Sequence, residues 1–169
     1  MAASLDLKRG IGTTAGTERD AIYNLYVQFG TLDSAQGSSG DSPIGIPTDG
    51  TKNYSTEVVL YLKVTNAPAN SVDNIRFWSA GKEIGSGATM YVGSTSVPST
   101  PTTNQSTIAD TDAITYTDSD NSLLWSDASL VDIDDTSEYL YMQIGVDSSA
   151  SIGDLNNQYM VYHYSYDES

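Results

Sequence analysis

The sequence predicts an all-β protein, a single β-sandwich of about seven or eight strands with two long polar loops and either immunoglobulin-like or jelly-roll topology. Apolar side chains recur at every second position in several short runs, which is the pattern of half-buried strands. No window keeps a helical period over the roughly ten residues that a helix needs. The 14 glycines and five prolines lie mostly between these runs, where they favour turns. A chain of 169 residues is long enough for one compact domain with its own core.

Residues 1–16 are expected to form an N-terminal arm, and residues 17–169 to form the sandwich domain. Residues 21–29 predict the first strand, because their odd positions are aromatic or aliphatic. A long loop rich in Gly, Ser, Asp and Pro follows at residues 30–53. Its length is typical of an interaction loop rather than a tight turn.

Residues 57–65 predict the strand on which the core is built. Tyr61 falls on its outer face, and the inner face holds Val58, Leu60, Leu62 and Val64. Residues 138–146 repeat the pattern, with Tyr139 and Tyr141 outward and Leu140, Met142, Ile144 and Val146 inward. We expect the two strands to be neighbours or facing strands of one core.

The other apolar runs are shorter. They predict strands at residues 74–79, 88–93, 113–117, 123–125 and 158–165. In the first of these, Arg76 and Trp78 are expected on the outer side. Residues 94–107 are Ser, Thr and Pro with almost nothing apolar, and predict the second long loop. Residues 166–169 are expected to form a polar tail.

Composition excludes several classes of function. The net charge is −15, and all seven Lys and Arg residues lie at or before Lys82. Such a polyanion repels nucleic acid and anionic membranes, so neither is expected as a partner. There are no cysteines, which excludes disulfides, thiolate metal sites and cysteine nucleophiles. Because no signal peptide or transmembrane run is found, we expect synthesis in a host cytoplasm.

No motif in the chain predicts catalysis. His163 is the single histidine, and it falls within a predicted strand, which favours a half-buried or surface strand residue over a catalytic base. The sequence contains no nucleophile elbow, phosphate loop or zinc-protease motif. We therefore expect a non-enzymatic protein.

Clustered aspartates raise the question of calcium, although no cofactor is expected. Asp118 and Asp120 begin a stretch like an EF-hand loop, but Leu123 and Ser129 occupy the positions that need Gly and Glu. A looser site could draw on Asp110, Asp112, Asp118, Asp120, Asp132, Asp134 and Asp135. Solvated turn aspartates are the favoured interpretation.

The chain has 12 tyrosines, which is many for its length. Outward tyrosines on a sheet can stack on sugars, pair across strands, or be covered by a partner. We favour a protein interface that includes Tyr61, Tyr139 and Tyr141, with Lys8 and Arg9 contributing from the N-terminal arm.

Four stretches carry a resemblance to a known group of proteins. They are Asn-Ile-Arg-Phe-Trp at 74–78, Met-Tyr-Val-Gly at 90–93, Tyr-Leu-Tyr-Met-Gln-Ile-Gly-Val at 139–146 and Tyr-Ser-Tyr-Asp-Glu at 164–168. In this order, over residues 44–168, they resemble small virion structural proteins of tailed bacteriophages. The resemblance carries no catalytic residues.

The resemblance implies a virion protein, of the capsid decoration, cement or minor capsid type, that binds the outer surface of the head. The implied partners are the major capsid protein or other virion proteins, with the chain present as a homo-oligomer or as lattice-bound copies. Attachment through Lys8 and Arg9 or the 30–53 loop would leave the acidic half facing solvent. The alternative is a carbohydrate- or receptor-binding β-sandwich module associated with a tail or fibre.

Overall fold

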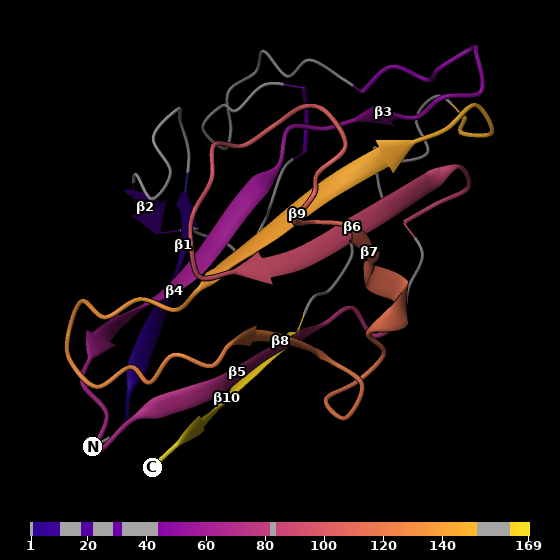
Figure 1. The fold of residues 1–169 in the computed structure, drawn as a ribbon. Coiled ribbons are helices and arrows are strands. Elements are labelled where there is room, and N and C mark those ends of the chain that lie inside the picture. The colour runs from indigo at the N-terminus through magenta and orange to yellow at the C-terminus, as the bar shows by residue number, and fades with distance from the viewer. Residues whose placement is uncertain (1, 11–17, 22–28, 32–43, 82–83, 152–162) are drawn as a thin grey trace.

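The computed structural model describes residues 2–10, 18–21, 29–31, 44–81, 84–151 and 163–169. Two antiparallel β-sheets make up this part of the chain, which confirms the predicted all-β sandwich (Figure 1). The one helix in it is a short 3-10 helix, η2 (Ala113–Thr115). None of its helices is long and apolar enough to cross a membrane.

The larger sheet has seven described strands in the order β2-β1-β4-β9-β6-β7, with β3 also paired to β9. Their bounds are β1 (Ser4–Gly10), β2 (Glu18–Ala21), β3 (Asn53–Tyr54), β4 (Val58–Asn66), β6 (Ala88–Thr95), β7 (Thr111–Asp112) and β9 (Tyr139–Val146). The expected neighbours β4 and β9 are paired directly, with Val58 opposite Met142 and Leu60 opposite Leu140. The alternation in the sequence therefore places both strands correctly in one sheet.

The smaller sheet has three described strands in the order β10-β5-β8. They are β5 (Val72–Trp78), β8 (Leu123–Ser126) and β10 (His163–Glu168). The two sheets meet along both sides. On one side the Ser94 hydroxyl in β6 donates to the Leu124 carbonyl in β8 (3.0 Å). On the other, the Ala3 amide beside β1 donates to the Glu168 carboxylate in β10 (2.7 Å).

The core lies between the inner faces of the two sheets. The expected inward residues of β4, β5 and β9 are all buried there, and Trp125 of β8 completes the cluster. Leu62 and Ile75 are fully buried. Burial of one such side chain stabilises a fold by about 1.5–3 kcal/mol, so this cluster is the main source of stability.

The first part of the predicted N-terminal arm is a strand, so that prediction is wrong for residues 4–10. β1 pairs with β4 along its whole length, with Leu5 opposite Val64 and Leu7 opposite Leu62. Leu5 and Leu7 pack against the core. Their two-residue spacing matches a half-buried strand, and the charged Asp6 between them falls on the other side.

Two further predictions need correction. Residues 113–117 were expected to form a strand, but the Asp112 carboxylate accepts a hydrogen bond from the Ile114 amide (3.1 Å) and caps η2 instead. The predicted polar tail contributes residues 166–168 to β10. Most of the predicted strand at 21–29, the middle of the 30–53 loop and residues 158–162 lie outside the described residues.

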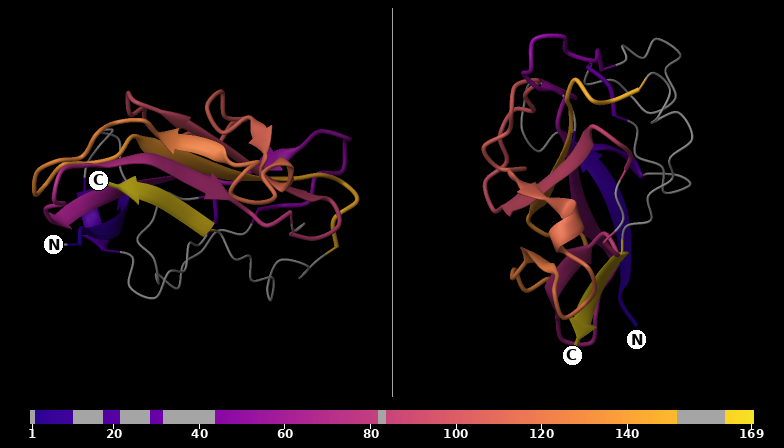
Figure 2. Two further views of the ribbon diagram at one scale, coloured as in Figure 1. Left: turned by 90° about the horizontal axis from the view of Figure 1, so that it is seen from below. Right: turned by 90° about the vertical axis from the view of Figure 1, so that its right-hand side faces the viewer.

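Both ends of the described chain lie at the same end of the molecule (Figure 2). The Ala2 carbonyl accepts a hydrogen bond from the Asn66 side chain (2.8 Å), and the Ser169 carbonyl accepts one from the Asn70 amide (2.9 Å). β3 and the end of β9 lie at the opposite end (Figure 1).

Candidate functional site

The outer face of the larger sheet is covered by a segment of the chain itself. Residues 96–110, here called the strap, leave β6 and cross in front of β4 and β9 before β7 (Figure 1). This is the predicted second long loop, and its composition of Ser, Thr, Pro and Asn leaves few apolar side chains to hold it. Polar side chains of the sheet bind its backbone instead.

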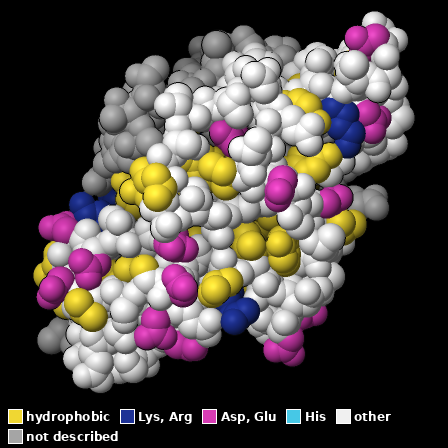
Figure 3. All heavy atoms as spheres, in the orientation of Figure 1, with side chains coloured by type: hydrophobic (Ala, Val, Ile, Leu, Met, Phe, Trp, Pro, Cys, Tyr) yellow, Lys and Arg dark blue, Asp and Glu magenta, His cyan; other side chains and the backbone are white. Residues whose placement is uncertain are grey.

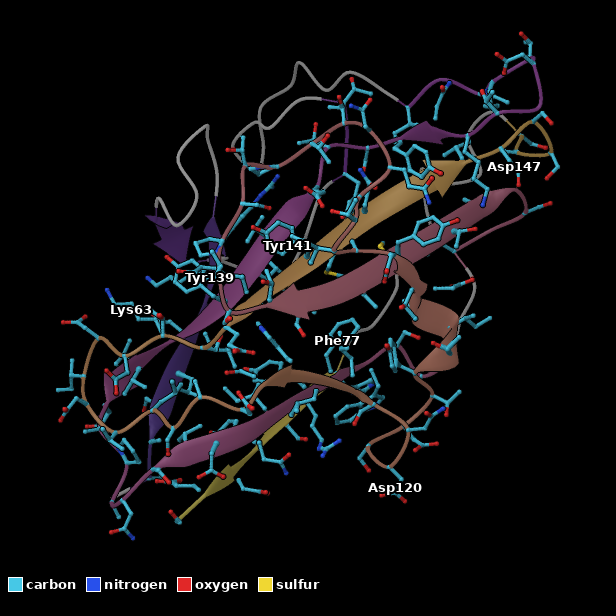
Figure 4. All side chains as sticks on the ribbon, viewed as in Figure 1. Lys63, Phe77, Asp120, Tyr139, Tyr141 and Asp147 are labelled. Carbon is cyan, nitrogen blue, oxygen red and sulfur yellow. The ribbon has the colours of Figure 1, made fainter. Side chains whose placement is uncertain are left out.

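Tyr141 is the first of these side chains. Its hydroxyl donates to the Ser99 carbonyl (2.9 Å) and accepts from the Ser99 amide (2.6 Å). Its position on β9 is labelled in Figure 4. The side chain has no exposed surface. Tyr141 therefore anchors the strap.

Gln143 and Glu57 hold the next part of the strap. The Gln143 side-chain amide donates to the carbonyls of Ser55 (2.9 Å) and Asn104 (2.7 Å), and its oxygen accepts from the Ser106 amide (2.9 Å). The Glu57 carboxylate accepts from the Thr102 amide (2.9 Å). Both side chains are buried. Buried polar groups of this kind stabilise a fold only when they are paired, so sheet and strap depend on each other.

The strap approaches the sheet most closely at Gly93. A Cβ atom at this position would lie 1.8 Å from the Ile108 carbonyl oxygen. The turn that brings Ile108 there is held by the Ser106 hydroxyl, which accepts from the amides of Ile108 (2.9 Å) and Ala109 (2.7 Å). Glycine at 93 is required because the two backbones are in contact.

These contacts change the interpretation of the outward tyrosines. Tyr61 and Tyr141 are 4% and 0% exposed, so neither presents a surface to a partner, and their prediction as interface residues is wrong. Tyr139 is half-buried, with its ring 5.7 Å from that of Tyr61 in an edge-on arrangement. The tyrosines of β4 and β9 pack within the domain.

The basic residues of the predicted arm belong to the larger sheet. Lys8 lies on β1, with its ammonium 3.7 Å from the Asp6 carboxylate. Arg9 pairs with Leu60 in register and is buried. Because β1 is paired throughout, Lys8 and Arg9 are not carried on a separate arm.

The outer face of the smaller sheet carries a different set of side chains. We call the surface formed by Arg76, Trp78, Leu124 and His163 the Trp78 face. Trp78 pairs with His163 across β5 and β10, and their rings stack at 5.4 Å with an interplanar angle of 10°. Arg76 pairs with Leu124 across β5 and β8. All four are half-buried or exposed, and Leu124 is 42% exposed.

Hydrogen bonds fix the cation of this face. The Arg76 guanidinium donates from Nε to the Asn74 side chain (3.0 Å) and from Nη1 to the Ser122 hydroxyl (3.4 Å). His163 lies on a surface strand, as the sequence predicts. The arrangement presents one cation, one indole and one aliphatic side chain on the same face of the sheet, beside a shift of register between Ile75 and Arg76.

Two of the aspartates considered as calcium ligands, Asp118 and Asp135, accept hydrogen bonds within their own turns. The Asp118 carboxylate accepts from the amides of Asp120 (3.0 Å) and Asn121 (2.9 Å), and that of Asp135 accepts from Val131 (2.8 Å) and Asp132 (2.9 Å). These backbone hydrogen bonds lower the pKa of both Asp118 and Asp135.

The calcium candidates are not gathered at one place. Asp134 lies 3.1 Å from the Lys63 ammonium, and Figure 4 shows Lys63 and Asp120 at opposite sides of the molecule. Asp112 caps η2, as described above. In the described ranges, no group of three or more His, Cys, Asp or Glu side chains is placed to hold a metal ion.

Comparison with known proteins identifies no relative. No protein-family model, no curated protein and no solved structure matches the chain.

Proposed function

We propose that this chain is a non-enzymatic structural protein of a tailed-bacteriophage virion, a capsid decoration or minor capsid protein that binds the outer surface of the head. The observation that carries the proposal is the Trp78 face. This surface takes the place of the N-terminal arm and the outward tyrosines as the site of attachment.

The two outer faces of the sandwich differ in what they can offer a partner. The strap covers much of the larger sheet, whose buried polar side chains form hydrogen bonds with the strap backbone. The Trp78 face presents Trp78, Arg76 and Leu124 to solvent on two neighbouring strands. Trp and Arg are enriched among the residues that dominate binding energy at protein interfaces.

Charge and resemblance support the same proposal. Residues after Lys82 contain 14 of the 22 acids and no Lys or Arg, which gives a surface that repels nucleic acid. A strongly acidic chain is compatible with the outside of a particle. The partner we propose is the major capsid protein or another virion protein, with many copies following the capsid lattice.

Co-sedimentation tests the proposal directly. The purified chain would be added to shells assembled from the major capsid protein of the same virus, and the bound fraction measured. We expect saturable binding that each variant weakens by roughly tenfold or more, since Trp78→Ala removes the indole of the face and Arg76→Glu reverses its positive charge.

Lys63→Glu is the matched control, because it reverses a cation of β4 that lies away from the Trp78 face and pairs with Asp134. It should leave binding unchanged. Thermal unfolding of each variant shows whether the fold is kept. Failure of the unaltered chain to bind shells, or equal binding by a folded Trp78→Ala variant, would overturn the proposal.

A further inference from the structure

A second cluster of polar and aromatic side chains lies at the end of the larger sheet that is remote from both chain ends. It consists of Lys52, Tyr54, Tyr91 and Asp147, carried by the β3 segment, β6 and the end of β9. Figure 4 labels Asp147 at this end, and Figure 3 shows basic, acidic and apolar side chains together on the same part of the surface. The cluster plays no part in the Trp78 face, which lies on the other sheet.

Two tyrosine rings form the apolar part of the cluster. The Tyr54 and Tyr91 ring centroids are 6.3 Å apart, and the ring planes are tilted by 48°. Both rings lie over Gly145, where a Cβ atom would come within 2.9 Å of Tyr91 and 3.0 Å of Tyr54. Because glycine has no side chain, both rings pack directly on the backbone of the sheet at this position. Both tyrosines are half-buried, so part of each ring remains exposed.

Polar groups surround the two rings. The Lys52 ammonium donates to the Tyr91 hydroxyl (2.7 Å) and lies 5.4 Å from the centre of the Tyr91 ring. The Tyr91 hydrogen bond is the main cause that raises the Lys52 pKa, so the ammonium stays charged at neutral pH. The Asp147 carboxylate uses Oδ1 to accept from the Ser149 amide (2.8 Å) and hydroxyl (2.6 Å).

We propose that Lys52, Tyr54, Tyr91 and Asp147 form a binding site for a neutral oligosaccharide of pyranose sugars. A pyranose ring has an apolar face of C–H groups and an edge of hydroxyls. Two adjacent half-buried tyrosines offer flat apolar surfaces with polar tips, and an ammonium and a carboxylate beside them offer a donor and an acceptor. The combination of a tilted aromatic pair with both kinds of polar group fits a sugar better than an aliphatic ligand.

Charge selects neutral sugars over anionic ones. The chain has a net charge of −15, and the cluster sets one ammonium against the Asp147 carboxylate, whose charge acts on Lys52. Asp49, in the same exposed loop as Lys52, adds a further negative charge. Sialylated or sulphated sugars would be repelled by this field.

A glycan array tests the site with the full chain. The probes are short neutral oligosaccharides of hexose and N-acetylhexosamine, with sialylated and sulphated oligosaccharides on the same array. We expect signal on a subset of the neutral probes. Tyr54→Ala and Lys52→Ala should each reduce that signal roughly tenfold, which is a typical loss for one well-placed contact.

Two further variants make the result specific. Lys63→Ala removes a lysine at another position and should leave the signal unchanged. Gly145→Ala keeps both tyrosines but forces their rings to move, and should reduce binding while thermal unfolding shows an intact fold. A titration with the best neutral probe, followed by amide NMR, should shift the Gly145 and Tyr91 signals first. Signal on anionic probes alone, no signal on any neutral probe, or full binding by folded Tyr54→Ala would overturn the proposal.

Discussion

Tyr141 and Ser99 exchange two hydrogen bonds through a single hydroxyl group, which donates to the Ser99 carbonyl at 2.9 Å and accepts from the Ser99 amide at 2.6 Å. One side chain of the sheet thereby satisfies both backbone groups of a strap residue. A loop with almost no apolar side chains can be held on a sheet in this way, because the side chain that makes both hydrogen bonds is itself buried.

Replacement of Tyr141 by phenylalanine removes both hydrogen bonds and leaves the Ser99 backbone unpaired. We expect Tyr141→Phe to lower the free energy of unfolding by about 1–3 kcal/mol, measured by urea denaturation. Amide hydrogen exchange in the strap should accelerate. Tyr164→Phe is the control, since Tyr164 is 40% exposed and packs its ring edge-on against Trp125. Equal losses in the two variants would contradict the anchoring role.

Replacement of Gln143 by glutamate should make stability depend on pH. The native amide group donates to the carbonyls of Ser55 and Asn104, and a carboxylate cannot donate to them. The folded state should therefore raise the pKa of the introduced carboxyl group. The resulting loss of stability is absent below the pKa of the glutamate in the unfolded chain, about 4.3. It grows as the pH rises through that pKa.

Thermal unfolding of Gln143→Glu and the unaltered protein between about pH 3 and pH 7 checks this, because that interval spans the pKa of an ordinary glutamate. The two melting temperatures should converge at the acidic end and separate toward neutrality. A constant difference across the range would show that the buried amide is not the relevant group.

Replacement of Gly93 by alanine should displace the strap. The added Cβ would lie 1.8 Å from the Ile108 carbonyl oxygen, which belongs to the backbone and cannot rotate away. We expect a loss of about 3 kcal/mol or more, at the upper end of overpacking effects. Gly10→Ala is the matched control, because the nearest atom to its Cβ would be 3.6 Å away in Val59. Chemical denaturation measures the free energy of unfolding of both variants, and a loss in Gly93→Ala no larger than in Gly10→Ala would contradict this prediction.

Acid should destabilise the fold through its turn aspartates. Hydrogen bonds from neighbouring residues lower the pKa of Asp118 and Asp135 below the ordinary value of 3.8. A lowered carboxyl pKa contributes stability that is present above the unfolded value and is lost as the pH falls through the folded value. We therefore expect the melting temperature to fall below about pH 4.

In the double variant Asp118→Asn, Asp135→Asn the melting temperature should fall less at acidic pH, because asparagine cannot titrate. Asp120→Asn changes an exposed aspartate of the same turn as Asp118 and serves as the control. If the control reduced the acidic fall in melting temperature as much as the double variant, net charge rather than the two turns would be responsible for that fall.

The sequence predicts the inner faces of the sandwich well. Val58, Leu60, Met142 and Ile144 recur at every second position, and this period directly reflects which side of a strand is buried. Leu5 and Leu7 carry the same signal in β1, but only two apolar positions among charged residues make it weak. The capping aspartate at 112 is the signal that identifies η2 in place of a strand.

The outer faces could not be predicted in the same way. Tyr141 and Gln143 occupy outward positions that alternation alone assigns to solvent, yet both are fully buried. What covers them is a segment whose own composition indicates an exposed loop, because it is held through its backbone. The cluster of Lys52, Tyr54, Tyr91 and Asp147 could not be predicted from the sequence either. Its two tyrosines and Gly145 are distant in the chain and meet only through strand pairing.

The way the strap is held also bears on how its sequence can change. Tyr141, Gln143 and Glu57 contact amides and carbonyls that every residue except proline possesses. Exposed side chains such as Val97 and Asn104 contribute little to this attachment. Mutations could therefore accumulate at those positions while the fold persists, and foreign peptide segments could be grafted there for display on the surface.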